Sequence, residues 1–251
     1  MTKLIITGAN GRMGKVLQSI IANRDDCEIV AGVDINTEQS ADFPVYSKIS
    51  DVNEDADVII DFSNPILLDD LLEYSNKNKV ALVLATTGYD EEQKSKIHEA
   101  SKQSPIFFTY NMSMGINLLA SLAKKAVEVL GNDFDIEIVE KHHNQKIDAP
   151  SGTALMLADA ICEVTPNPMK YEYDRHAKRE KRTKNEIGLH AIRGGTIVGE
   201  HDIIFAGRDE IITLSHSARS KEIFAVGAVN AAIYMCGKNP GLYDMSELIS
   251  E

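Results

Sequence analysis

The first half of the chain alternates short β-branched runs with segments of helical spacing, and this alternation is what most constrains the fold. Five runs of about five residues predict buried strands, at 3–7, 28–34, 58–62, 80–85 and 106–109. Helical spacing follows at 12–23, 66–77 and 91–102, with expected helix starts at Asn64-Pro65 and Asp90. Strands that alternate with helices form right-handed βαβ units, so we expect an α/β fold built on a doubly wound parallel sheet.

The pattern changes after Asn111. A long helix is expected at 113–130, then a strand at 134–142 and a helix at 151–164, followed by strands at 187–193, 202–205 and 210–216. Strands in series predict an inserted α+β domain with a mixed sheet. A last helix at 221–236 is expected to return to the first domain. We therefore predict one domain from 1–112 and 220–251, and a second from 113–219.

Composition excludes several classes of protein. The chain has 26 Lys and Arg against 38 Asp and Glu, a net charge of −12, which argues against a nucleic-acid binder. No apolar run approaches the ~18 residues of a membrane span, and no signal peptide is recognisable. The three cysteines are scattered, which argues against a disulfide framework. We expect a cytoplasmic protein.

A glycine-rich turn, Gly8-Ala9-Asn10-Gly11-Arg12-Met13-Gly14, directly follows the first predicted strand and opens the first predicted helix. In such turns the glycines permit a tight bend, close approach of backbone N–H groups to a pyrophosphate, and close packing of helix on sheet. The partial positive charge of the helix N-terminus favours the phosphates. The spacing G-x-x-G-x-x-G and its context predict a dinucleotide site.

Asp34 ends the second predicted strand, 20 residues after Gly14. A carboxylate there accepts hydrogen bonds from the ribose hydroxyls of NAD and repels a 2′-phosphate. The following Ile35-Asn36 offers no guanidinium to compensate, so we expect NADH to be preferred over NADPH. Arg12 and Lys15 lie nearby and leave use of both cofactors open.

The segment 140–154, EKHHNQKIDAPSGTA, contains most of the remaining chemistry. His142 and His143 at a strand end should point to opposite sides and have different roles. Lys146 is a candidate proton donor. Ser151, Gly152 and Thr153 open a helix whose N–H groups and hydroxyls suit a carboxylate.

This segment has two other interpretations. His142, His143 and Asp148 could be metal ligands, but neighbouring strand histidines cannot both face one ion, so no metal is expected. Surface histidines ahead of a capped helix are the simpler alternative.

The motif Glu-x-His-His-x-x-Lys-x-Asp-Ala-Pro-Ser-Gly-Thr-Ala resembles the signature of the 4-hydroxy-tetrahydrodipicolinate reductase (dihydrodipicolinate reductase) family. Other parts resemble the family in the same order along nearly the whole chain: 8–14, Asp61-Phe62-Ser63 before Pro65, Thr86-Thr87-Gly88, 111–117, Arg193-Gly194-Gly195 and 198–201. Two positions depart from the family pattern. Ala85 stands where glycine is usual, and Met112 where an aromatic residue is common.

The resemblance implies reduction of a cyclic hydroxylated dicarboxylate with NAD(P)H and loss of water, giving tetrahydrodipicolinate, a step in diaminopimelate and lysine biosynthesis. It also implies a Rossmann-type domain, an inserted α+β domain and a homotetramer formed through that domain's sheet. By the same resemblance His142 would donate or accept a proton and Lys146 would donate one, while His143, Ser151, Gly152 and Thr153 would hold substrate. The residues implied for the dinucleotide are Gly8, Ala9, Asn10, Gly11, Arg12, Met13, Asp34, Ala85, Thr86, Thr87, Thr109, Tyr110, Asn111 and Met112.

Two rival functions remain: a different dehydrogenase built on the same nucleotide domain, or a sensor that binds NAD(H) without turnover. The presence of His142 and Lys146 argues against the sensor. A run of basic residues at 170–184 is open to two interpretations, a solvated loop or an arm that reaches a neighbouring subunit or an anionic ligand.

Overall fold

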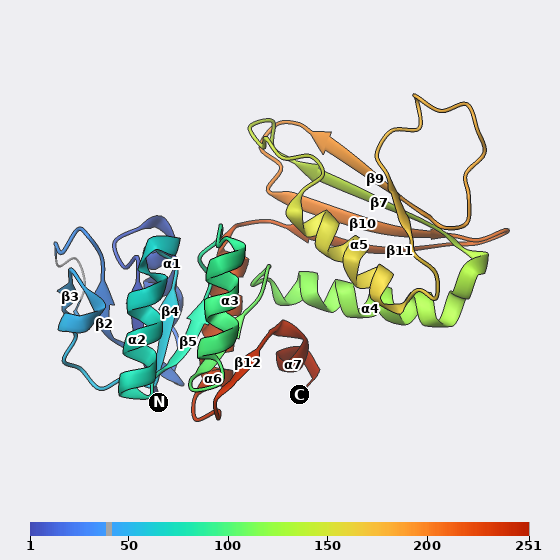
Figure 1. The fold of residues 1–251 in the computed structure, drawn as a ribbon. Helices are drawn as coiled ribbons and strands as arrows, with labels where there is room; N and C mark the ends of the chain where they lie inside the picture. Colours follow the sequence, from blue (N-terminus) through green and yellow to red (C-terminus); the bar gives the residue numbers. More distant parts are fainter. Residues whose placement is uncertain (39–41, 251) are drawn as a thin grey trace. The chain divides into compact units, whose positions relative to one another are not determined.

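The computed structural model describes residues 1–38 and 42–250, and the chain divides into two compact units (Figure 1). The first unit comprises Met1–Ser113 and Glu222–Glu251, and the second comprises Met114–Lys221. Within the described residues, no helix has both the length and the apolar character needed to cross a membrane.

A seven-stranded sheet, parallel throughout, forms the centre of the first unit. Its strand order is β12-β6-β5-β4-β1-β2-β3, and the strands are β1 (Thr2–Thr7), β2 (Cys27–Val33), β3 (Val45–Tyr46), β4 (Val58–Asp61), β5 (Ala81–Leu84), β6 (Pro105–Phe108) and β12 (Gly241–Tyr243). The chain leaves β1 in one direction to β2 and β3, and returns on its other side to β4, β5 and β6. Doubly wound sheets bind ligands at such a reversal, beyond the carboxyl ends of the strands.

Side-chain alternation along the strands divides the core of this unit between the two faces of the sheet. Leu4, Ile6 and Ile60 lie in a cluster with apolar residues of α1 (Arg12–Ile21) and α6 (Glu222–Met235). Ile5 and Ile59 point the other way, into a cluster with residues of α2 (Leu68–Asn78) and α3 (Glu91–Ala100). Both faces are buried, which is why the strands are apolar throughout rather than alternating.

In the first unit, capping side chains determine where two helical segments begin. Asp90 forms the expected cap of α3, since its carboxylate accepts from the Gln93 N–H while the Gln93 side chain accepts from the Asp90 N–H. Asn64 caps a short 3₁₀ turn, η2 (Pro65–Leu67), so α2 begins at Leu68 rather than at the predicted residue 66. A last helix, α7 (Met245–Ser250), follows β12.

The second unit is a five-stranded mixed sheet with two helices on one face (Figure 1). Its strand order is β11-β10-β7-β9-β8, and the strands are β7 (Asp135–His142), β8 (Lys170–Glu172), β9 (Glu186–Arg193), β10 (Gly199–Ala206) and β11 (Ile211–Ala218). Strand β7 pairs parallel with β9 and antiparallel with β10. The helices α4 (Met114–Leu130) and α5 (Gly152–Val164) contribute Leu119, Ala123 and Leu157 to a core with Ile138 and Phe205.

Other predictions of secondary structure also need correction. The sequence does not predict the strands β3, β8 and β12, because two or three residues are too short for a periodic pattern to appear. The strand β10 is longer than the predicted 202–205, because pairing with both β7 and β11 extends it to eight residues.

Candidate active site

The glycine-rich turn lies at the carboxyl end of β1, and a side chain would not fit at its first or last glycine. Gly8 has a φ of +73°, and a Cβ there would lie 2.5 Å from the Phe62 carbonyl oxygen. A Cβ on Gly14 would lie 2.2 Å from the Gly8 carbonyl oxygen, so α1 packs tightly under the turn, as expected. In the part of the chain that the structure describes, no side chain caps the N-terminus of α1 at Gly11. The turn therefore fits a pyrophosphate, with Ala9, Arg12 and Met13 on the same segment.

The Asp34 carboxylate lies beside this turn. Its Oδ2 accepts from the backbone N–H of Asn10 at 2.9 Å, and its Oδ1 accepts from that of Asn36 at 2.9 Å. The Asn10 amide in turn donates to the Asn36 carbonyl at 2.6 Å. These bonds hold the carboxylate at the edge of the turn, where a ribose bound above β2 would meet it.

A buried polar network lies under the same edge and includes residues to which no role had been assigned. The Asp61 carboxylate is fully buried and accepts from the hydroxyls of Thr7 and Ser63 and from Tyr89 at 3.1 Å. Thr86 accepts from the Ser63 N–H at 2.8 Å. Burial, together with the Asp61 charge, raises the pKa of Tyr89 above its ordinary value, so Tyr89 stays a donor. The network connects β1 and β4 with the segment after β5.

The remaining residues expected at the dinucleotide differ in exposure. Ala85 follows β5, with its N–H bonded to the Asp61 carbonyl, and Thr87 is exposed. The hydroxyl of Thr109 donates to the Asn111 carbonyl at 3.5 Å, and Tyr110 is 74% exposed. Met112 is buried among the apolar core residues of the first unit.

In the second unit, the end of β7 directs Glu140 and His142 to the buried face of the sheet. Both residues are buried, and Nδ1 of His142 lies 2.6 Å from Oε2 of Glu140. Arg193, on the neighbouring β9, donates two hydrogen bonds to the same carboxylate at 2.7 and 2.8 Å. Burial by itself raises the pKa of Glu140, but bonds from Arg193, His142 and the Ser151 N–H outweigh it and hold that pKa below its usual range.

A third histidine completes this cluster. His201, on β10, is 3% exposed, and its ring centroid lies 5.2 Å from that of His142 in an edge-to-face arrangement. Its Nε2 lies 3.2 Å from the Ser151 hydroxyl oxygen. Burial, reinforced by His142, lowers the pKa of His201 to about 4, so this ring is neutral at pH 7. Sequence reasoning assigned no role to Glu140, Arg193 or His201, although all three lie in segments that match the family pattern.

Lys146 lies on the loop after β7. Its ammonium is paired with Asp148 at 2.9 Å and its side chain is 23% exposed. That pairing lowers the pKa of Asp148. His143 is half-buried just beyond the strand, and its carbonyl accepts from the Lys146 N–H at 3.2 Å. Arg193 also donates to the Asp148 carbonyl at 2.5 Å, which connects the Lys146 loop to the Glu140 cluster.

The start of α5 differs from expectation at one residue. Ser151 is 1% exposed, its hydroxyl caps the helix by accepting from the Ala154 N–H, and its own N–H donates to Glu140. Its polar groups are therefore used within the protein. Gly152 is exposed and Thr153 is half-buried. The chain thus brings Glu140, His142 and Ser151 into one bonded cluster.

The basic run at 170–184 is largely paired within its own unit. Arg175 bonds to Glu186 at 2.7 Å, and Lys178 bonds to Glu172. Arg182 reaches Glu137 at 3.0 Å and donates to two backbone carbonyls of neighbouring strands. These pairs favour the interpretation as a solvated loop over an arm for an anionic ligand.

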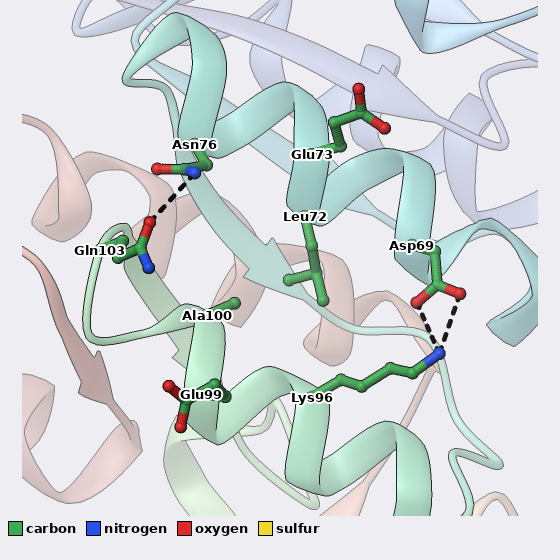
Figure 2. Close-up of a pocket in the computed structure, with 8 residues that line it drawn as sticks. All are labelled: Asp69, Leu72, Glu73, Asn76, Lys96, Glu99, Ala100 and Gln103. Carbon is green, nitrogen blue, oxygen red and sulfur yellow. Dashed lines mark hydrogen bonds and ion pairs between the residues drawn. The ribbon is translucent and has the colours of Figure 1, made fainter.

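One surface hollow, of about 360 Å³, lies between α2 and α3, away from these residues, and is lined mainly by charged and amide side chains (Figure 2). An ion pair between Lys96 and Asp69 at 2.9 Å and a hydrogen bond between Asn76 and Gln103 at 3.2 Å cross it. Within the described residues, no group of three His, Cys, Asp or Glu side chains forms a metal site.

Comparison with known proteins gives one consistent result. The family model described as dihydrodipicolinate reductase, N-terminus, matches residues 2–112, and the model for the C-terminus matches 115–249. Two curated proteins named 4-hydroxy-tetrahydrodipicolinate reductase are similar: one from Caldanaerobacter subterraneus subsp. tengcongensis is 55% identical, over 100% of this chain and 99% of its own length. The other, from Clostridium tetani, is 49% identical, over 100% and 98%.

A solved structure is similar in fold over the same extent. The dipicolinate-bound dihydrodipicolinate reductase from Paenisporosarcina sp. TG-14 matches with a TM-score of 0.81 and 26% identity, and the match covers 97% of each chain.

Proposed function

Because the chain belongs to the 4-hydroxy-tetrahydrodipicolinate reductase family, we propose that it reduces 4-hydroxy-tetrahydrodipicolinate to tetrahydrodipicolinate in lysine and diaminopimelate biosynthesis. The substrate gains one hydride and one proton and releases one water. The nicotinamide nucleotide supplies the hydride when it is bound. The observation that carries the proposal is a pair of proton-handling side chains on one short segment, His142 and Lys146, with a cluster of buried polar groups behind His142.

His142 is suited to exchange a proton with the substrate. Its Nδ1 is bound to Glu140, whereas Nε2 has no hydrogen-bond partner among the described residues. The Lys146 ammonium provides a second donor on the following loop, six residues before the exposed start of α5. General acid–base catalysis of this kind contributes about 10²–10⁴-fold to a rate.

Substrate carboxylates would be held by His143 and by the N-terminus of α5. Gly152 and Thr153 occupy the first turn of this helix, where backbone N–H groups and the helix dipole favour an anion. Ser151 would support this site indirectly, because its hydroxyl caps the helix and its N–H holds Glu140.

The nucleotide would lie on the glycine turn, with Asp34 at the adenosine ribose and with Ala85–Thr87 and Thr109–Met112 along the same sheet edge. NADH would be the preferred cofactor, since a 2′-phosphate would face the Asp34 carboxylate. Arg12 and Lys15 are exposed nearby, so NADPH can serve as well. Steady-state kinetics with both cofactors test the preference, and a tenfold better kcat/KM with NADPH would refute it.

The assembly would be a cytoplasmic homotetramer formed through the sheet of the second unit. The face opposite α4 and α5 carries apolar side chains, among them Ile192, 47% exposed, and Ile211, 68% exposed. Light scattering in solution tests this assembly, because a tetramer has four times the mass of the 27.6 kDa monomer.

The direct test of the activity follows the absorbance of reduced nicotinamide as the purified chain turns over the cyclic hydroxylated dicarboxylate. We expect oxidation of NADH that depends on both protein and substrate. Binding of NADH without turnover would favour the sensor instead.

A further inference from the structure

Three of the four groups in contact with the two oxygens of Glu140 can only donate, namely both terminal nitrogens of Arg193 and the Ser151 N–H. Oε1 accepts from Nη2 of Arg193 at 2.7 Å and from the Ser151 N–H at 3.0 Å. Oε2 accepts from Nη1 of Arg193 at 2.8 Å and lies 2.6 Å from Nδ1 of His142. The bonds to Glu140 keep its pKa below the usual range, so it is ionised at pH 7 and can only accept. Nδ1 of His142 must therefore carry the proton in this contact.

The guanidinium that fixes the carboxylate is itself held in place. Nη1 of Arg193 also donates to the Ile192 carbonyl at 2.8 Å, and Nη2 donates to the Asp148 carbonyl at 2.5 Å. Arginine stays charged throughout the physiological pH range and presents its donors in a rigid fork. Glu140 is therefore held in a single orientation by two strands and the start of α5.

The other groups around His142 do not compete for its proton. Glu140 faces it from β7, Arg193 lies behind Glu140 on β9, and His201 packs against the ring from β10. His201 is neutral at pH 7 because burial lowers its pKa to about 4. Gly199, also on β10, leaves open the space beside Nε2 of His142, where a Cβ would approach to 3.1 Å.

We propose that Glu140 and Arg193 are positioning residues that hold neutral His142 with its proton on Nδ1, so that the lone pair of Nε2 faces the substrate. This deepens the proposed function and rests on it, since it assigns the reacting nitrogen of His142. When Nε2 takes up a proton, the ring becomes a cation, and its charge is balanced by the ionised Glu140 at 2.6 Å. Glu140 itself stays ionised throughout.

The substitution Glu140→Gln tests this assignment, because its effect on the ring can be derived from the same contacts. The position of Oε1 faces two groups that can only donate, Nη2 of Arg193 and the Ser151 N–H. The position of Oε2 faces one such group, Nη1 of Arg193, and the His142 ring, which can also accept. The amide oxygen of glutamine should therefore take the place of Oε1, and the amide NH₂ then loses the bond from Nη1 of Arg193 and donates to Nδ1 of His142. The ring proton moves to Nε2, which no longer offers a lone pair.

We expect kcat of Glu140→Gln to fall by about 10²–10⁴-fold with KM changed much less, by analogy with other His–carboxylate pairs in which an amide reverses the tautomer. Glu140→Asp keeps an ionised acceptor and should recover part of this loss. The matched control is Glu137→Gln, because Glu137 also lies on β7 and pairs with a histidine, His190 at 2.7 Å, and with Arg182, on the opposite face of the sheet. It should leave kcat within about twofold of wild type.

The deciding measurement is the ¹⁵N spectrum of the histidine side chains in the full-length protein, at a pH where His142 is neutral, with His142→Ala for assignment. We expect a proton on Nδ1 of His142 in the wild type and in Glu137→Gln, and on Nε2 in Glu140→Gln. A wild-type ring protonated on Nε2, or a Glu140→Gln ring still protonated on Nδ1, would overturn the proposal. The wild-type spectrum decides the point even if Glu140→Gln fails to fold. If the tautomer is reversed in Glu140→Gln but turnover is undiminished, the positioning role of Glu140 is supported. The same result would contradict the proposed role of His142 in the reaction.

Discussion

A substitution at Gly14 tests the proposed nucleotide site, because two backbone carbonyl oxygens leave no space for a side chain at this position. A Cβ at this position would lie 2.2 Å from the Gly8 carbonyl oxygen and 2.3 Å from that of Ala9. Contacts of a Cβ below 3.0 Å are essentially never found, so either the turn or α1 must move by about 0.8 Å in Gly14→Ala. Overpacking of this kind costs about 1–3 kcal/mol.

The same movement would displace the backbone N–H groups proposed to hold the pyrophosphate. A loss of about 1.4 kcal/mol weakens binding tenfold, so we expect the Kd for NADH to rise by about tenfold or more. Titration of nucleotide fluorescence measures the Kd, and urea unfolding measures the stability of the same sample. Gly194→Ala is the control, because a Cβ there meets no atom within 4 Å among the described residues. Binding of NADH by Gly14→Ala within about twofold of wild type would refute the role of the turn.

Three further changes test separate parts of the molecule. In Asp34→Ala the loss of a charged ribose acceptor should raise KM for NADH about tenfold and leave KM for NADPH less affected, as measured by steady-state kinetics. In Tyr89→Phe one bond to the buried Asp61 is lost, so the free energy of unfolding in urea should fall by about 1–2 kcal/mol. Arg175 lowers the pKa of Glu186 to about 2, with help from Thr183, so this pair stabilises the fold above pH 4.5 and its contribution is lost as the pH falls toward 2. In Arg175→Met, acid unfolding followed by circular dichroism should therefore begin at a higher pH.

A specific result would contradict each of these three predictions. Unchanged selectivity between NADH and NADPH in Asp34→Ala would remove the ribose contact from the proposal. A Tyr89→Phe variant as stable as wild type would mean that the bond to Asp61 contributes nothing to stability. An unshifted acid transition in Arg175→Met would show that Glu186 does not depend on Arg175.

Local patterns predicted the elements that depend on local physics. The β-branched run at 3–7 corresponds to β1, because a parallel strand buried on both faces must be apolar throughout. Asp90 predicted the start of α3, because a capping side chain acts on N–H groups only three residues away. Val45–Tyr46 could not be predicted as a strand, since only its register beside β2 makes it one.

The sequence predicted only some of the site residues of the second unit, because the others are brought together by strand pairing. His142 and Lys146 are close in sequence and were recognisable together. Arg193 is 53 residues from Glu140 and reaches it only because β7 and β9 pair in parallel with His142 opposite Arg193. His201 enters through the antiparallel pairing of β10 with β7, in which it lies opposite Glu140. Contacts set by strand register leave no periodic signal in a single sequence.

The most direct test of the proposed reaction compares the wild type with His142→Ala and Lys146→Ala in one turnover assay, with the Kd for NADH measured on the same preparations. Both side chains lie in the second unit, away from the glycine turn in the sequence, so nucleotide binding should persist in both variants. We expect the wild type to reduce the cyclic hydroxylated dicarboxylate and each variant to lose about 10²-fold or more in kcat. Near-normal turnover by either variant would contradict its assignment as a proton-transfer residue.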